Sequence, residues 1–372
     1  MNNTIKEVLY NTPYLSTDIV ENCFIPNQHT FVDKISCGNG FTTAFLNIPP
    51  TETYKCNLIV VPNRKVVISK QKSYYKDNNP NKTKIGFIYG DDSADALDFN
   101  KFDVMMFVVD SFIMSIDRIK NNEDYIDKIL LDEGHSFVIQ SSYRKALNQF
   151  QKVVVDTFPT KAIVTVTATP MLFQKADVVI KSENILKRDI NISQNQEQTL
   201  SRIQKDLADG KNVLIALQDA RILRKLADKN NKLTANVLCG VTMFQKVLEN
   251  VVLDVNPKSN LTIISSSGFE GFDLDNGINN IYIFEDRAFD YTTFYPQNIV
   301  QIIGRSRNGT DYIEWNRIPY PSRTELLPKD VMIKKANSDK ISFEKKMTDK
   351  NYTFIPKFFE IEFNEELGLI TS

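Results

Sequence analysis

The stretch Ile129-Leu130-Leu131-Asp132-Glu133-Gly134-His135 is the most informative about the fold of this 372-residue chain. An aliphatic run leads directly into two adjacent carboxylates, which are followed by one of only 2 histidines in the sequence. Uninterrupted aliphatic runs are typical of strands buried on both faces of a parallel sheet. Ligands of such sheets bind at the carboxyl ends of the strands. We therefore expect Asp132 and Glu133 to lie at a binding site, where one could hold magnesium and the other could activate water. The alternative is a solvated acidic pair in a loop.

Short apolar runs that are rich in Val and Ile recur along most of the chain and indicate further buried strands. They cover residues 58–61, 85–89, 104–109, 163–166, 213–217, 237–239, 261–265 and 281–284. Segments long enough for helices, such as 143–151, 198–207 and 220–228, separate some of these runs. This alternation predicts an α/β fold with two consecutive domains and mainly parallel sheets. We assign residues 1–185 to the first domain, 198–320 to the second, and 321–372 to a C-terminal extension without a predicted role.

The composition narrows the class of protein. The chain is 42% hydrophobic and 24% charged, which is ordinary for a globular protein and argues against disorder. Its 45 Lys and Arg residues balance 46 Asp and Glu residues, so nucleic-acid binding would depend on a local groove. Apolar runs fall short of the roughly 20 residues that cross a bilayer, and the N-terminus has no apolar signal segment. We expect a cytoplasmic protein with no membrane partner, located in the host cytoplasm if a phage encodes it.

The sequence Asp132-Glu133-Gly134-His135 resembles the DExH box of superfamily-2 helicases, and further motifs of that family occur in the family's order. They are a phosphate-binding loop at 36–43 (SCGNGFTT), two strand-contacting motifs at 61–71 (VPNR, then Gln71) and 109–112 (VDSF), a coupling motif at 167–170 (TATP), and two second-domain motifs at 268–274 (GFEGFDL) and 301–307 (QIIGRSR). Each motif alone is weak evidence, but their order and spacing together indicate a helicase-like fold.

This resemblance implies two tandem RecA-like domains that bind ATP and Mg²⁺ between them and a DNA or RNA strand across both. It implies catalytic roles for Asp132, Glu133, His135 and Arg305. The residues expected to contact the nucleotide are Gly38, Asn39, Gly40, Phe41, Thr42, Thr43, Asp273, Gln301 and Arg307. The expected magnesium ligands are Asp132 and Thr42, and the expected nucleic-acid contacts are Pro62, Arg64 and Ser111.

Two residues depart from the family pattern, and both departures remove a cation that would contact phosphate. Phe41 stands where the family has the lysine of the phosphate-binding loop, and Asn308 stands where it has its last arginine. A lysine there places a positive point charge on the phosphates, so its loss should weaken nucleotide binding or slow hydrolysis. Lys34 is the nearest candidate for a replacement cation. Between that role and an ordinary surface lysine before a loop, the sequence alone favours the surface lysine.

Two classes of function follow from these observations. The first is an ATP-dependent helicase or translocase that moves on nucleic acid and depends on a protein partner for its target. The second is a nucleic-acid-binding or scaffolding protein that keeps the helicase fold with a defective ATPase. The two differ at the phosphate loop. The first needs a cation there from a residue other than Phe41, and the second needs no cation. A nucleotide kinase is a poorer interpretation, since it leaves the second-domain motifs unexplained.

Overall fold

The computed structural model describes most of the chain up to residue 317 and two short strands beyond it. The described residues are 5–76, 83–90, 97–139, 147, 149–170, 175–183, 188–218, 221–227, 233–238, 251–254, 259–265, 277–285, 294, 296–306, 310–317, 362–364 and 369–371. No helix within these ranges is long and apolar enough to cross a membrane.

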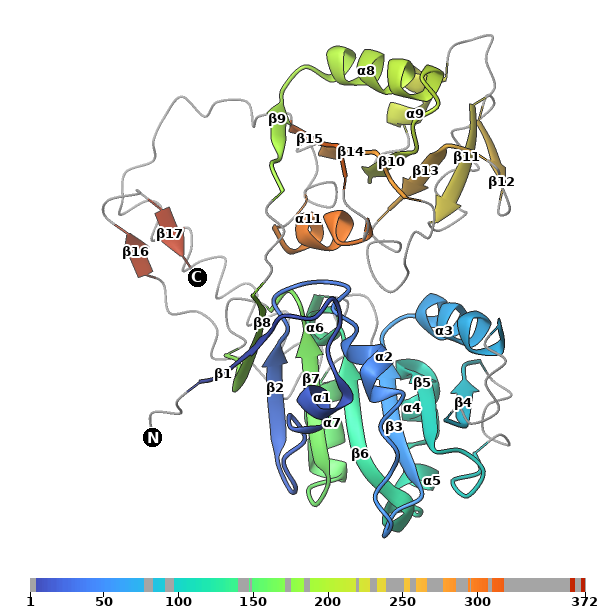
Figure 1. Cartoon of the computed structure of the whole chain (residues 1–372), viewed down its shortest axis with the longest axis vertical. Coiled ribbons are helices and arrows are strands. Elements are labelled where there is room, and N and C mark those ends of the chain that lie inside the picture. The colour runs from blue at the N-terminus through green and yellow to red at the C-terminus, as the bar shows by residue number, and fades with distance from the viewer. Residues whose placement is uncertain are drawn as a thin grey trace, which may run out of the picture.

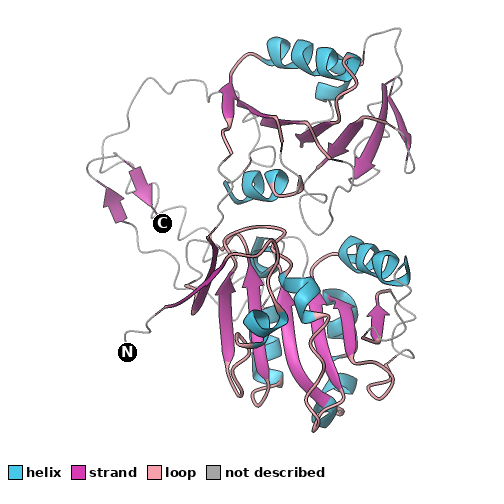
Figure 2. Cartoon of the chain, in the orientation of Figure 1, coloured by secondary structure: helices cyan, strands magenta, loops and turns pink. Residues whose placement is uncertain are grey.

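The first domain is built on an 8-stranded sheet in which all pairs of neighbours are parallel. The strand order is β1-β8-β2-β7-β6-β3-β5-β4. The strands are β1 (Lys6–Tyr10), β2 (His29–Asp33), β3 (Cys56–Val61), β4 (Ile85–Ile88), β5 (Val104–Val108), β6 (Ile126–Asp132), β7 (Ala162–Thr167) and β8 (Val178–Ser182). The helices around this sheet (Figures 1 and 2) are α1 (Thr17–Glu21), α2 (Phe41–Phe45), α3 (Arg64–Lys76), α4 (Val109–Met114), α5 (Ile116–Lys120), α6 (Gly134–Ile139) and α7 (Phe150–Thr157).

The second domain is built on a 7-stranded parallel sheet of order β12-β11-β13-β10-β14-β15-β9. Its strands are β9 (Asn191–Ser193), β10 (Val213–Leu217), β11 (Leu233–Leu238), β12 (Val251–Asp254), β13 (Leu261–Ile264), β14 (Asn280–Glu285) and β15 (Tyr312–Arg317). Its described helices are α8 (Gln196–Ala208), α9 (Arg221–Leu226) and α11 (Pro296–Ile303). Because β9 pairs with β15, this sheet begins before residue 198. Near the C-terminus, β16 (Glu362–Asn364) and β17 (Leu369–Thr371) form a separate antiparallel pair.

The central strands are mostly apolar because both faces of each sheet are covered. All 6 residues of β3 and all 5 of β5 are buried. In the second domain, Leu200 and Ile203 of α8 belong to one apolar cluster, whereas Ile299 and Ile302 of α11 belong to another. The predicted α/β fold with mainly parallel sheets is therefore confirmed.

The candidate site lies where the carboxyl ends of the first sheet face the second domain. Figure 1 shows α11 of the second domain next to the end of the first sheet at which β2, β6 and β7 terminate. Residues that follow these strands therefore meet residues carried by α11, which is the placement expected for a ligand site in an open parallel sheet.

Candidate active site

The two carboxylates of the DEGH sequence lie at the end of β6, on a tight turn. Asp132 is the last residue of the strand, and its Oδ2 accepts a hydrogen bond of 2.5 Å from Thr42 Oγ1 in α2. The main chain of Glu133 has a φ of 56°, a left-handed conformation that is uncommon for residues other than glycine. The next residue, Gly134, approaches β7 so closely that a Cβ there would lie 2.4 Å from Thr165 Cγ2. The local sequence thus fits a turn that presents both carboxylates beside α2.

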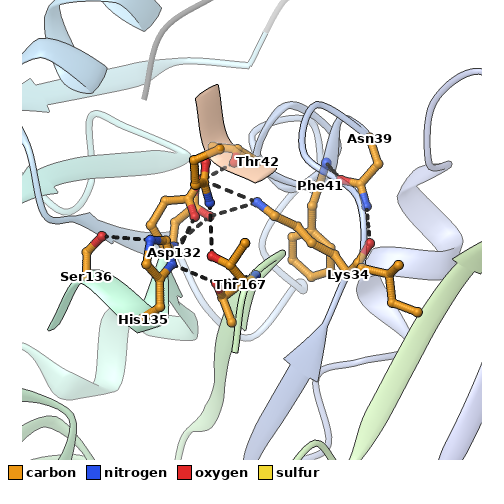
Figure 3. A network of polar contacts seen from close by, with 12 residues as sticks. Lys34, Asn39, Phe41, Thr42, Asp132, His135, Ser136 and Thr167 are labelled. Carbon is orange, nitrogen blue, oxygen red and sulfur yellow. Dashed lines mark hydrogen bonds and ion pairs between the residues drawn. The ribbon is translucent and has the colours of Figure 1, made fainter. Parts of the chain in front are cut away.

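Lys34, the first residue after β2, places its ammonium group between these carboxylates. Its Nζ lies 3.6 Å from Asp132 Oδ1 and 3.7 Å from Glu133 Oε1, and its side chain is only 6% exposed (Figure 3). Burial alone would lower the pKa of Lys34, but the charges of Glu133 and Asp132 outweigh burial and raise the pKa above the usual value of a lysine. Lys34 is therefore positively charged. The prediction of a surface lysine is wrong, because the residue after a central strand points into the site.

The phosphate-binding loop connects β2 with α2 and turns at two glycines. Gly38 and Gly40 have φ values of 77° and 84°, conformations that glycine adopts without strain. Asn39 bridges the loop, since its Nδ2 donates to the carbonyl of Lys34 and its Oδ1 accepts from the N–H of Phe41. The ring of Phe41 is 1% exposed and belongs to the apolar core of the first domain. Residue 41 therefore anchors the loop to the core and brings no polar side-chain atom to the site.

A single pocket brings most of the expected nucleotide-contacting residues together, with contributions from both domains. Its lining consists of Lys34, Gly38, Asn39, Gly40, Phe41, Thr42, Thr43, Val61, Val66, Lys70, Asp132, Glu133, Gly304 and Arg305. Thr43 accepts a hydrogen bond of 3.0 Å from Lys70 Nζ of α3. The pocket therefore contains cations from three separate elements of the fold.

A chain of polar contacts runs from the DEGH sequence through the TATP sequence to the second domain. His135 is buried, its Nδ1 lies 2.8 Å from Thr167 Oγ1 and 3.5 Å from Glu133 Oε2, and Ser136 Oγ lies 3.3 Å from its Nε2. The N–H of Thr169 donates to the same Thr167 hydroxyl (3.1 Å). Across the domain boundary, Gln301 Nε2 donates to Thr169 Oγ1 at 3.1 Å. His135 therefore lies behind the carboxylates, in the position of a residue that orients them.

The second domain presents Arg305 at the end of α11. Arg305 Nη2 donates to Gln301 Oε1 at 2.8 Å, and its Nε donates to the Gln301 carbonyl at 3.1 Å. Arg188, which precedes β9, donates to the carbonyls of Ile303 (2.8 Å) and Ser306 (2.7 Å) and so caps the end of this helix. Sequence reasoning missed Arg188, because no motif marks it. Asp273 and Arg307 lie outside the described residues.

The residues predicted to contact nucleic acid lie at the ends of β3 and β5. Pro62 is buried after β3, and the exposed Arg64 begins α3, with its guanidinium 4.9 Å from the ring centre of Tyr89. Ser111 Oγ accepts a hydrogen bond of 3.2 Å from the N–H of Gly90, which follows β4. Tyr89, which no sequence motif marks, thus lies against Arg64 of the first motif, and its neighbour Gly90 contacts Ser111 of the second.

Fold and site together define a protein of two parallel α/β domains with a pocket of phosphate-loop type at their junction. Residues 10–172 match the family model described as "Type III restriction enzyme, res subunit". No curated protein sequence matches the chain. The similarity to this family therefore covers most of the first domain and includes the phosphate-binding loop and the DEGH and TATP sequences.

Solved helicase structures share this fold at low sequence identity. A Mycobacterium smegmatis helicase Lhr bound to ssDNA and AMP-PNP superposes with a TM-score of 0.54 at 13% identity, over 82% of this chain and 46% of the helicase, so this chain spans about half of that protein. The DEAD-box helicase Mss116 bound to ssRNA and UDP-BeF also superposes with a TM-score of 0.54, at 12% identity, over 94% of this chain and 90% of the helicase. S. cerevisiae Dbp5 bound to RNA and ADP BeF3 superposes with a TM-score of 0.54 at 13% identity, over 81% of this chain and 83% of Dbp5. The chain therefore has the same fold as these structures, with two tandem RecA-like domains and mainly parallel sheets.

Proposed function

We propose that this protein is an ATP-dependent helicase or translocase of the DExH type that acts on nucleic acid. The observation that carries the proposal is the pocket at the domain junction, where Thr42, Asp132 and Glu133 of the first domain face Arg305 of the second. A pocket formed by both domains can couple nucleotide hydrolysis to a change in domain closure.

The donor set of the pocket fits magnesium and a triphosphate. The Asp132 carboxylate and the Thr42 hydroxyl are hard oxygen ligands of the kind that Mg²⁺ prefers, and they already lie 2.5 Å apart. Glu133 Oε2 is buried and accepts no hydrogen bond from the described residues, so it is available to water. When bound, the metal ion would neutralise charge on the phosphates.

The remaining steps belong to side chains of this chain. Glu133 accepts the proton of the attacking water as the oxygen of that water bonds to the γ-phosphorus and ADP leaves. His135, at 3.5 Å from Glu133 Oε2, orients this carboxylate. Arg305 stabilises the charge that develops on the γ-phosphoryl group. Gln301 contacts both Arg305 and Thr169, and we infer that it links the state of the nucleotide to the relative position of the domains.

The nucleic-acid path is proposed to cross the ends of β3, β4 and β5. Arg64 offers a cation to the phosphate backbone, and Tyr89, held by a 2.7 Å hydrogen bond from its hydroxyl to Gln71 Oε1, borders it. Because the chain has almost no net charge, we infer that a protein partner brings it to its target, and we propose a cytoplasmic location. The scaffolding alternative is less favoured, since a protein that only binds nucleic acid has no need of Glu133 opposite Arg305.

The test is the ATPase rate of the full chain with and without single-stranded DNA, single-stranded RNA or duplex. Stimulation by one nucleic acid, lost in Glu133→Gln and in Arg305→Ala, supports the proposal. Nucleic-acid binding without any ATP hydrolysis would instead favour the scaffolding alternative. A strand-displacement assay then separates unwinding from translocation.

A further inference from the structure

We propose that Lys34 replaces the missing lysine of the phosphate-binding loop and supplies the cation that contacts the β- and γ-phosphates of the nucleotide. This inference rests on the proposed function, because it requires that the pocket binds a nucleoside triphosphate. It assigns the role to the residue that follows β2, whereas the resemblance to helicases places it at residue 41.

The first observation is the burial of a charged group. Lysine is seldom fully buried unless it is paired, because removing its charge from water is costly. Lys34 is 6% exposed on its side chain, and its ammonium group contacts Asp132 and Glu133. A lysine held at two carboxylates of a proposed catalytic pair is positioned for the chemistry of the site rather than for the surface.

The second observation concerns the other cations that line the pocket. Arg305 comes from the second domain and is held by Gln301, so it reaches the phosphates only when the domains are together. Lys70 of α3 donates a hydrogen bond to Thr43 Oγ1 of α2. Lys34 is the one whose Nζ lies 3.6 Å from Asp132, the carboxylate that also accepts the Thr42 hydroxyl.

The third observation is that Lys34 and the loop are fixed to each other. The N–H of Lys34 donates to the carbonyl of Thr167 at 2.8 Å, and its own carbonyl accepts from Asn39 of the loop. The main chain is therefore held on both sides, while the four-carbon side chain can swing. On binding, the ammonium group exchanges its carboxylate partners for phosphate oxygens, and Asp132 becomes available to the metal ion.

The experiment measures dissociation constants of the full chain for ATP, ADP and AMP in the presence of Mg²⁺. In Lys34→Gln, which keeps a hydrogen-bond donor for the two carboxylates, affinity for ATP and ADP should fall about 10- to 100-fold, the loss expected for one charge-assisted contact. Affinity for AMP should change less than about threefold. If Lys34 had only a structural role, Lys34→Gln would lower the affinity for ATP, ADP and AMP by the same factor.

The matched control is Lys128→Gln. Lys128 is also a buried lysine of the same sheet paired with two carboxylates, Asp127 at 2.7 Å and Glu21 at 3.3 Å. It lies four residues before Asp132 on β6, roughly 13 Å away at the rise of a strand. Its substitution should leave the preference for ATP over AMP unchanged.

The outcomes are distinguishable. If Lys34→Gln does not fold, Lys34→Arg keeps the charge and should keep the ATP-over-AMP preference, and loss of that preference in a folded Lys34→Arg protein would overturn the assignment. A folded Lys34→Gln protein that prefers ATP as the wild type does would also overturn it. Wild-type protein that binds neither ATP nor ADP refutes the proposed function itself.

Discussion

Gly304 of the second domain lies against Cys37 of the phosphate-binding loop, and a Cβ on Gly304 would lie 2.5 Å from the Cβ of Cys37 and 3.2 Å from its Sγ. The two domains therefore meet at a position where only a hydrogen atom fits. Arg305 follows Gly304 directly, so this close approach determines how far the arginine reaches into the pocket. The pKa of the Cys37 thiol is raised to about 11 by burial and by the charge of Glu133, and the group is neutral at this junction.

Gly304→Ala should hold the domains apart and lower kcat/KM for ATP by about 10-fold or more, since small displacements of a catalytic group cost this much. The measurement is steady-state ATP hydrolysis with saturating nucleic acid. Adding Cys37→Gly to Gly304→Ala removes the two Cys37 atoms that the new methyl group meets and leaves only the Val300 carbonyl oxygen at 3.1 Å, so it should restore part of the lost rate. Equal rates in Gly304→Ala and wild type would show that the junction is not this tight during turnover.

Glu133→Gln should lower ATP hydrolysis at least about 100-fold while ATP binding survives, because the carboxylate acts on water and not on the phosphates. Turnover and binding are measured on the same preparation. The main-chain turn at Glu133 does not depend on the charge, so the variant should fold as the wild type does. Wild-type turnover in this variant would remove Glu133 from its role as the base.

Arg188→Ala should reduce turnover more than ATP binding, because the arginine holds the carbonyls of Ile303 and Ser306 on either side of Arg305. Arg188→Lys should be intermediate, since a lysine does not reproduce the two-pronged contact of a guanidinium. Arg118→Ala is the control. Arg118 lies on α5 of the first domain and also donates to a main-chain carbonyl, that of Leu97, but it does not line the pocket. Similar losses in Arg188→Ala and Arg118→Ala would indicate general destabilisation.

Phe41→Lys should destabilise the first domain by about 3–5 kcal/mol, the usual cost of removing a buried aromatic ring, because its side chain is 1% exposed. Restoring the family's residue at 41 is therefore expected to harm the protein. Urea unfolding measures the change, and Phe41→Leu, which keeps the site apolar, should cost less. A Phe41→Lys protein of wild-type stability would mean that the ring contributes little to the core.

Asp206→Asn should lower the free energy of unfolding by about 1 kcal/mol at neutral pH, because Tyr282, Lys211 and Asn280 donate to this buried carboxylate. Burial would raise the pKa of Asp206, but these hydrogen bonds outweigh burial and hold the pKa below its usual value of 3.8. The contribution is thus present above pH 3.8 and is lost as the pH falls through the folded-state pKa. Unfolding titrations of both proteins should converge in that acid range. A constant difference would contradict the charge-dependent explanation.

Strands that are apolar at every position could be predicted from the sequence. The run 213–217 coincides with β10 because all of its residues are buried. Strand β15 was not predicted, since its sequence contains Glu314 and Asn316, which are buried but hydrogen-bonded to Thr199 of α8. A polar residue satisfied by a distant partner carries no local signal of burial.

The predicted helical segment 143–151 overlaps the described helix α7 only at its last two residues. Helix α7 runs over Phe150–Thr157, and most of the segment before it lies outside the described residues. The motifs of the site could be found because each one is local. The contacts of Arg188 and Gln301 could not, because they join residues separated by more than 100 positions, and the contact of Gln301 with Thr169 also depends on how the domains meet.

The burial of Phe41 beside a lysine that follows β2 has a consequence for how such a site could evolve. If the cation comes from Lys34, the backbone of the loop and its positive charge are encoded at two separate positions. A change of Phe41 to lysine alone would place a second cation in the core. Loss of the positive charge at residue 34 alone would leave Asp132 and Glu133 without this counter-ion. The two positions are therefore expected to change together, and a sequence pattern that demands lysine before the loop threonine would overlook proteins built in this way.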